Sequence, residues 1–143
     1  MYLLCTDGVA EFDLATQRFK TLLQGNVDAI YFNEKLYIGK REEVFVYNES
    51  TGNFDLFYHL AGKNITLSCL HLDKNKNLWM GTTSNGIYCL SEDKSLSQPV
   101  TKGNITSIYE DSSNELWIGS WEEGLYRVKT DGSIENLRHN PMN

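Results

Sequence analysis

The sequence predicts an all-β fold made of repeated units, and three observations support this prediction. A stretch that reads Leu-Trp-x-Gly and later Gly-x-Tyr occurs at residues 78–88 and again at residues 116–126, about 38 residues further on. Within each unit the apolar runs are short and alternate with polar residues, which is the period of a β-strand. Clusters of Gly, Asn, Asp and Ser separate these runs, as turns require. A fixed period of this length is typical of stacked copies of one supersecondary unit.

Two looser copies come earlier in the chain. Residues 36–47 fit the same frame with Tyr37 in place of the tryptophan, and residues 3–12 fit it with Cys5 in place of the glycine. In the second unit, the hairpin at residues 33–35 is two residues shorter than in the later units and lacks the aspartate. The register therefore occurs four times, in one domain over residues 1–143. The approximate boundaries of the four units are 1–24, 25–61, 62–101 and 102–140.

The last unit shows the predicted strands most clearly. Its four apolar runs, separated by turn-forming residues, are 105–109, 115–118, 125–128 and 134–137. Four short antiparallel strands in roughly 40 residues form one blade of a β-propeller. The sequence thus predicts a propeller segment of about four four-stranded antiparallel blades. The first blade would lack its innermost strand, and we expect the segment to be part of a larger propeller.

The repeated residues are interpreted as scaffold. Asp73 and Asp111 fall at the first hairpin turn of their units, where a short carboxylate can accept hydrogen bonds from the turn's own amides. The tryptophans would fill the space between blades. The glycines end the second strand and open the third, where a positive φ is common. The scaffold residues are Asp73, Leu78, Trp79, Gly81, Gly86, Asp111, Leu116, Trp117, Gly119 and Gly124.

These residues resemble the two-component regulator propeller repeat, whose pattern is roughly V-x-x-I-x-x-D-x-x-G-x-L-W-I-G-T, followed by a loop and Gly-Leu. Residues 105–125 match it closely and residues 67–87 almost as well, although Asn114 and Lys76 or Asn77 replace the usual turn glycine. In that family the repeats build the extracytoplasmic sensor region of hybrid two-component systems. The resemblance implies a periplasmic location, an oligosaccharide ligand, and a sensor histidine kinase in the parent protein.

Composition excludes several classes of function. The net charge is −6, from 13 Lys+Arg and 19 Asp+Glu, and no basic cluster is present, so a nucleic-acid partner is not expected. The chain has no run of about 20 apolar residues that would contact a membrane. Cys5, Cys69 and Cys89 lack ligand spacing and are expected to be buried free thiols, so neither a metal nor a cofactor is predicted.

The loops that join the second and third strands differ between copies, as a recognition surface requires. Trp121 is additional to the repeated tryptophan, so its ring could stack on a sugar while Glu122 accepts hydroxyl hydrogen bonds. Alternatively, Trp121 packs over its own blade or on a neighbour. Arg41 is either a ligand contact or a solvated charge paired with Glu42 or Glu43. The candidate ligand-binding residues are Trp121, Glu122, Arg41, Thr83 and Asn85.

Catalysis is not expected. The sequence has no G-x-S-x-G and no glycine-rich phosphate loop, and Glu122 and Glu123 are adjacent in one loop and cannot flank a bond. The three histidines, His59, His71 and His139, fall in different repeats. His71 could face the central channel of the propeller. We therefore predict a non-catalytic ligand-sensing segment of an extracytoplasmic two-component sensor that responds to oligosaccharide. The alternative is a protein–protein interaction scaffold that closes by oligomerising. The partners would be further blades of the parent chain, or other copies that pair through open edges.

Overall fold

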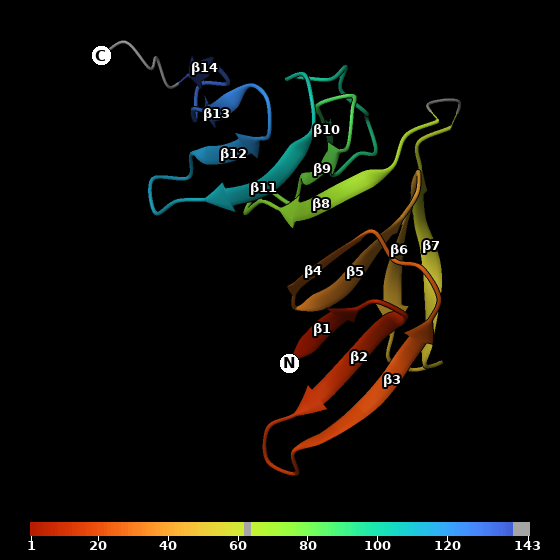
Figure 1. The fold of residues 1–143 in the computed structure, drawn as a ribbon. Helices are drawn as coiled ribbons and strands as arrows, with labels where there is room; N and C mark the ends of the chain where they lie inside the picture. The colour runs from red at the N-terminus through yellow and green to blue at the C-terminus, as the bar shows by residue number, and fades with distance from the viewer. Residues whose placement is uncertain (62–63, 139–143) are drawn as a thin grey trace. The chain divides into compact units, whose positions relative to one another are not determined.

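The computed structural model describes residues 1–61 and 64–138, which form fourteen strands in four antiparallel sheets (Figure 1). This confirms the predicted all-β propeller segment. The chain divides into two compact units, Met1–Leu67 and Ser68–Asn143, called unit 1 and unit 2 below. Residues 62 and 63, at the start of the third predicted blade, and residues 139–143, including His139, lie outside the described residues.

Unit 1 contains the first two sheets. The first has three strands, which agrees with the expected absence of its innermost strand, and the second has four. Val9, Leu36 and Ile38 are buried and form the centre of the unit's apolar core. The strands are β1 (Tyr2–Cys5), β2 (Gly8–Asp13) and β3 (Arg18–Gln24), then β4 (Ala29–Asn33), β5 (Lys35–Lys40), β6 (Glu43–Asn48) and β7 (Asn53–His59).

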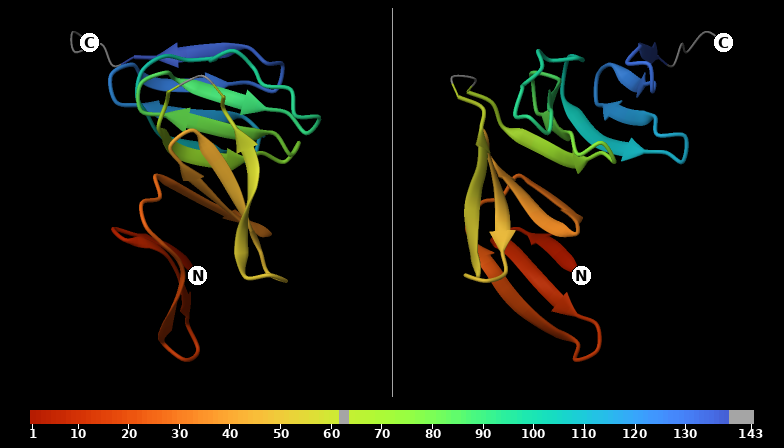
Figure 2. Two further views of the ribbon diagram at one scale, coloured as in Figure 1. Left: turned by 90° about the vertical axis from the view of Figure 1, so that its right-hand side faces the viewer. Right: turned by 180° about the vertical axis from the view of Figure 1, so that it is seen from behind.

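Unit 2 contains the third and fourth sheets, apart from the first residue of β8. Figure 2 shows the fourth sheet with its strands in chain order, from cyan to blue. Trp79 and Ile87 of the third sheet belong to one buried cluster with Leu116, Ile118 and Val128 of the fourth. The strands are β8 (Leu67–Leu72), β9 (Leu78–Thr82) and β10 (Ile87–Leu90), then β11 (Ile105–Glu110), β12 (Leu116–Ser120), β13 (Gly124–Val128) and β14 (Ile134–Leu137).

The prediction of four strands in each blade after the first is wrong for the third sheet, which has three. The segment after β10 still bonds to it, because Ser97 N donates to Cys89 O at 2.8 Å and Val100 N donates to Ile87 O at 2.9 Å. The two acceptors, Ile87 and Cys89, are two residues apart on β10, but the two donors, Ser97 and Val100, are three residues apart on the following segment. The register shifts there because Pro99, between the two donors, has no N–H and interrupts the ladder.

The three cysteines are free, but they are not all buried as predicted. Cys5 is exposed at the end of β1, while Cys69 and Cys89 are partly buried. Burial raises the pKa of the Cys69 thiol to about 11, and burial likewise raises the pKa of Cys89 to about 11. The two partly buried thiols therefore stay protonated at neutral pH and act as small apolar groups.

The first hairpin of the third sheet turns around the carboxylate of Asp73. One oxygen, Oδ1, accepts a hydrogen bond from Asn77 N at 2.8 Å. The other, Oδ2, accepts from Asn77 Nδ2 and from Trp79 Nε1, both at 2.9 Å. Lys76 completes the turn with a φ of 63°, in the left-handed region that favours glycine. This explains why the related repeat has glycine at this turn.

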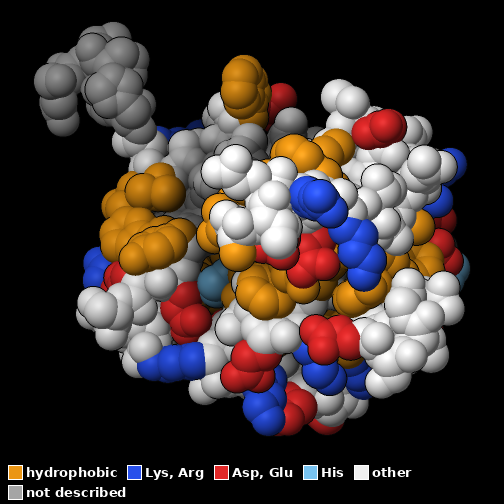
Figure 3. Space-filling view, turned by 90° about the horizontal axis from the view of Figure 1, so that it is seen from below, with side chains coloured by type: hydrophobic (Ala, Val, Ile, Leu, Met, Phe, Trp, Pro, Cys, Tyr) orange, Lys and Arg blue, Asp and Glu red, His pale blue; other side chains and the backbone are white. Residues whose placement is uncertain are grey.

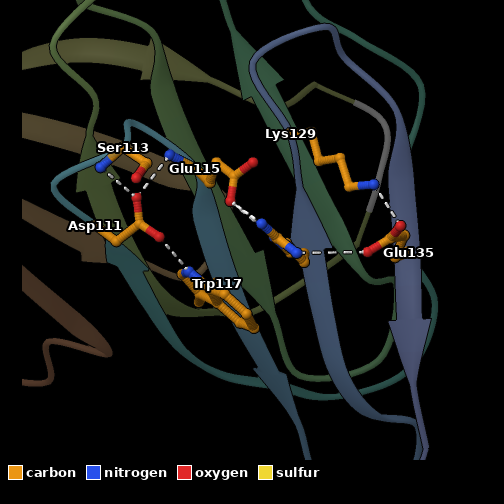
Figure 4. Close-up of polar contacts among 7 residues, drawn as sticks. Asp111, Ser113, Glu115, Trp117, Lys129 and Glu135 are labelled. Atoms are coloured by element: carbon orange, nitrogen blue, oxygen red, sulfur yellow. Dashed lines mark hydrogen bonds and ion pairs between the residues drawn. The ribbon is translucent and has the colours of Figure 1, made fainter.

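Asp111 builds the equivalent turn in the fourth sheet (Figure 4). Its Oδ1 accepts from Ser113 N at 2.8 Å and from Glu115 N at 3.1 Å, and its Oδ2 accepts from Trp117 Nε1 at 2.8 Å. Asn114 has a φ of 67° there. The sequence predicted the amide bonds to the aspartate but not the bond from the tryptophan indole. This bond links the start of the hairpin to the middle of the next strand.

A row of charged side chains crosses the fourth sheet beside Trp117 (Figure 4). The guanidinium of Arg127 lies over the Trp117 ring, 5.2 Å from its centroid. Arg127 also donates to Glu115 Oε2 from Nε at 2.7 Å and forms an ion pair with Glu135, which in turn pairs with Lys129. The row follows the register, in which Arg127 is opposite both Trp117 and Glu135. Opposite charges on one face of a sheet stabilise this pairing.

Candidate functional site

Three connecting segments of unit 2 lie side by side and form a surface called the loop face here. They are the β9–β10 loop, the linker at residues 102–104 and the β12–β13 loop. Asn85 pairs with Gly103 in a parallel bridge, and Gly86 N donates to Gly103 O at 2.9 Å. On the other side of the linker, Trp121 N donates to Asn104 O at 2.9 Å. Backbone hydrogen bonds therefore connect loops that are far apart in sequence.

Hydroxyl side chains fix the shape of both loops. Thr82 Oγ1 accepts from Asn85 N at 2.9 Å and donates to Gly86 O at 2.7 Å, so the buried hydroxyl closes the β9–β10 loop. Ser120 Oγ accepts from Glu123 N at 3.4 Å in the corresponding place. Neither Thr82 nor Ser120 was among the predicted site residues. The available signal was a hydroxyl residue directly after the strand-ending glycine in both copies.

Trp121 is 80% exposed on this loop face, so described residues do not cover its indole. The Trp121 side chain therefore does not pack over its own blade. Glu122 is also exposed and makes no ion pair among residues 1–61 and 64–138. Glu123, by contrast, forms an ion pair with Arg138. The loop thus presents one aromatic ring and one available carboxylate to solvent.

The other predicted ligand residues divide between the two units. Thr83 and Asn85 are exposed on the loop face, with Asn85 Oδ1 accepting a hydrogen bond from Ser84 at 2.8 Å. Arg41 belongs to the β5–β6 loop of unit 1, where its side chain is 73% exposed and its Nε lies 3.7 Å from Glu42 Oε2. This arrangement corresponds to the solvated charge paired with Glu42. Four of the five residues therefore share one surface, and Arg41 is part of the other unit.

His71 is outside the loop face. Its Nε2 lies 3.6 Å from Glu110 Oε2, and both side chains are largely buried. The backbone N–H of Lys74 donates to the same Glu110 oxygen at 3.3 Å. Because His71 is on β8 and Glu110 on β11, these contacts join the third sheet to the fourth. The pair is a link within the scaffold of unit 2.

Acidic and basic side chains are interspersed among hydrophobic ones on the face drawn in Figure 3, with no concentration of one sign among the described residues. In the described part of the chain there is no helix with the length and apolar character needed to cross a membrane.

The model of the family "Two component regulator propeller" matches residues 59–84 and 99–122. A comparison with curated protein sequences gave no match. Solved structures supply further likenesses. An extracellular domain assigned to a one component system of B. thetaiotaomicron has a TM-score of 0.79 at 19% identity, over 99% of this chain and 21% of that one.

Two more structures have the same fold. An extracellular domain assigned to a hybrid two component system of B. thetaiotaomicron has a TM-score of 0.75 at 22% identity, over 97% of this chain and 20% of that one. Virginiamycin B lyase from Staphylococcus aureus has a TM-score of 0.75 at 15% identity, over 95% of this chain and 50% of that one. The chain thus spans about a fifth of the first two structures and half of the third.

The family match and the structural likenesses agree on the same architecture. The two matched segments include both turn aspartates, Asp73 and Asp111, and both repeated tryptophans, Trp79 and Trp117. The solved structures extend the likeness in fold to nearly the whole chain. The chain is therefore a β-propeller segment, and its residues 59–84 and 99–122 match the model of the two-component regulator propeller family.

Proposed function

We propose that the chain is a non-catalytic, ligand-sensing segment of an extracytoplasmic two-component sensor, and that its ligand is an oligosaccharide. The fold shared with extracellular domains of such systems supports the location and the sensor class. Trp121, Glu122, Thr83 and Asn85 would contact the ligand on the loop face. Binding would change how downstream parts of the parent protein pack and so shift the equilibrium of a histidine kinase.

The observation that carries this proposal is the exposure of Trp121 between hydrogen-bonded loops. An indole that is 80% exposed offers a flat apolar surface for the face of a sugar ring. The carboxylate of Glu122 and the amide of Asn85 supply the few polar groups that fix a ligand's orientation. The loops that carry these groups are joined by backbone hydrogen bonds, so the surface is formed before the ligand arrives.

A thermal-shift screen with oligosaccharides, followed by titration of any stabilising glycan, tests this proposal. Trp121→Ala should weaken binding at least about tenfold, because buried aromatic anchors dominate recognition surfaces. The matched control is Tyr109→Ala, since Tyr109 is an aromatic residue of the same sheet that is 65% exposed on β11. Equal affinity of the Trp121→Ala variant and the parent chain for a confirmed glycan would rule out this site.

A second candidate function is an interaction scaffold that closes by oligomerising. The observation in its favour is a set of exposed apolar residues on the first and fourth sheets, including Leu4, Phe19, Leu125 and Leu137. If no glycan stabilises the chain and light scattering shows a defined oligomer, this function becomes the better account.

A non-catalytic role is also part of the proposal, although virginiamycin B lyase shares the fold and is named as an enzyme. The proposal rests on the adjacent position of Glu122 and Glu123 in one turn and on the ion pair of Glu123 with Arg138. Sequencing the coding DNA on both sides of the segment would test the sensor assignment directly. A continuous frame that encodes further blades, a membrane helix and a kinase would support it.

A further inference from the structure

Unit 1 contains a cavity of about 450 Å³ beside the turn between β4 and β5, a volume within the range of small-molecule sites. It is separate from the loop face, which belongs to unit 2. Leu36 and Val46 supply apolar surface, and two tyrosines and several charged side chains surround them. The lining residues are Tyr2, Glu34, Lys35, Leu36, Val46, Tyr47, Asn48, Glu49 and Asp55.

The cavity has an excess of negative charge. Glu34, Glu49 and Asp55 contribute three carboxylates, and Lys35 is the single cation among the lining residues. Asn48 Nδ2 donates to Asp55 Oδ2 at 2.8 Å, which holds one of these carboxylates in position. An excess of carboxylates beside an apolar surface favours a ligand with a positive charge.

The two tyrosines add a second reason to expect a cation. Each packs against a phenylalanine outside the cavity, Tyr2 on Phe32 at 4.8 Å and Tyr47 on Phe54 at 5.1 Å between ring centroids, so both rings are held in place. Burial raises the pKa of Tyr2, and the charges of Glu11 and then Glu49 contribute in the same direction. Aromatic rings fixed beside carboxylates in this way can present their faces to a cation.

The cavity lies at the second predicted blade, residues 25–61, where the sequence departs from the repeat. Its hairpin is two residues shorter and lacks the aspartate that elsewhere binds a tryptophan indole. The short turn places Glu34 at a φ of 57°, a conformation that is uncommon for residues other than glycine. Apart from Tyr2 of the first blade, the lining residues lie in the second blade, and Glu34 and Lys35 belong to its shortened turn.

From these observations we propose that the cavity is a binding site for a small organic cation with an ammonium group, held between Tyr2 and Tyr47 and neutralised by Glu49 and Asp55. The site is independent of oligosaccharide binding on the loop face. Cation–π attraction and the carboxylates act on the same group, and neither interaction is available to a neutral molecule of the same shape.

Titration of the chain with choline and with 3,3-dimethylbutan-1-ol tests the proposal, because these probes differ mainly in the charge of one central atom. At low ionic strength, choline should bind at least about tenfold more tightly than the alcohol, and added salt should weaken it. NMR chemical shifts of the lining residues would place the probe. Equal affinity for the two probes, or no binding of choline at millimolar concentration, would overturn the proposal.

Variants separate the two interactions. Tyr47→Leu should weaken choline binding several-fold and Tyr47→Phe should preserve it, because only the ring is needed. Glu49→Gln should also weaken binding, whereas Glu92→Gln removes the same charge from an exposed residue outside the cavity and should leave binding unchanged. Circular dichroism checks that each variant is folded. A Glu92→Gln effect equal to that of Glu49→Gln would show only a general charge effect and contradict the site.

Discussion

The carboxylate of Asp73 uses both oxygens to hold the first hairpin of the third sheet. Its partners are the backbone and side chain of Asn77 and the indole of Trp79, and the aspartate is only 7% exposed. A buried carboxylate is stable in such a place because several donors replace the water that it loses. The bond from the Trp79 indole to Asp73 also fixes the rotamer of Trp79, which belongs to the core of unit 2.

Asp73→Ala should therefore lower the free energy of unfolding by about 2–4 kcal/mol, since it removes three hydrogen bonds and leaves the Trp79 N–H without its acceptor. Urea unfolding measures this loss. Asp131→Ala is the control, because Asp131 also accepts a turn amide, from Ser133, but is exposed. If the two variants lose equal stability, the bond to the indole is not important.

The equivalent Asp111 predicts a pH dependence. Hydrogen bonds from the Trp117 indole and then from Glu115 N lower the pKa of the Asp111 carboxyl in the folded chain. A carboxyl with a lowered folded pKa stabilises the fold above its unfolded pKa of about 3.9, and this contribution is lost as pH falls through the folded pKa. Asp111→Asn should therefore reduce the dependence of unfolding free energy on pH below about pH 5. Identical pH profiles for the variant and the parent chain would contradict this.

At the turn into β10, the backbone of Gly86 lies very close to the backbone of Thr101. Gly86 has a φ of 75°, and a Cβ there would lie 1.9 Å from the carbonyl oxygen of Thr101. The neighbouring linker bonds to Gly86 N and pairs with Asn85. Glycine is thus required here both for the backbone conformation and for the space that the linker occupies.

Gly86→Ala should lower the free energy of unfolding by at least about 3 kcal/mol. The new Cβ forces the linker backbone to move, and the positive φ adds strain. Gly132→Ala is a matched control, with a φ of 82° and nothing within 4 Å of the new Cβ, and should cost only about 1 kcal/mol. Thermal and urea unfolding compare the two variants. Equal losses would show that the contact with Thr101 has no effect on stability.

For the whole molecule, the two units have different core clusters, with Ile38 in that of unit 1 and Ile118 in that of unit 2. Repeat folds derive their stability from each unit and its nearest neighbours, and they open locally. Ile38→Ala truncates a fully buried side chain and should lower the free energy of unfolding by about 2–4 kcal/mol.

Hydrogen–deuterium exchange by mass spectrometry should show where this cost appears. In the Ile38→Ala variant, exchange should rise first in β1–β7, while β9–β14 keep most of their protection. Ile118→Ala, which truncates an equally buried residue, should give the reverse pattern. A uniform rise over the chain in both variants would mean that the four sheets unfold as one cooperative unit.

The repeat period, most of the strands and the turn aspartates could be predicted from local sequence patterns alone. Alternation of apolar residues and turn chemistry act over a few neighbouring residues, so Asp111 and the four strands of the last unit could be predicted from sequence. Pro99, which interrupts the fourth strand of the third sheet, is also a local feature of the sequence, because proline has no N–H to donate.

Which distant residues meet depends on the packing of the folded chain. The indole bond to Asp73, the pairing of Asn85 with Gly103 and the bond from Trp121 to Asn104 depend on how loops and neighbouring sheets pack. The exposure of Trp121 and the acidic cavity of unit 1 likewise follow from packing. Such contacts join residues that lie far apart along the chain, and periodicity fixes only where each strand begins and ends, not which loops share a surface.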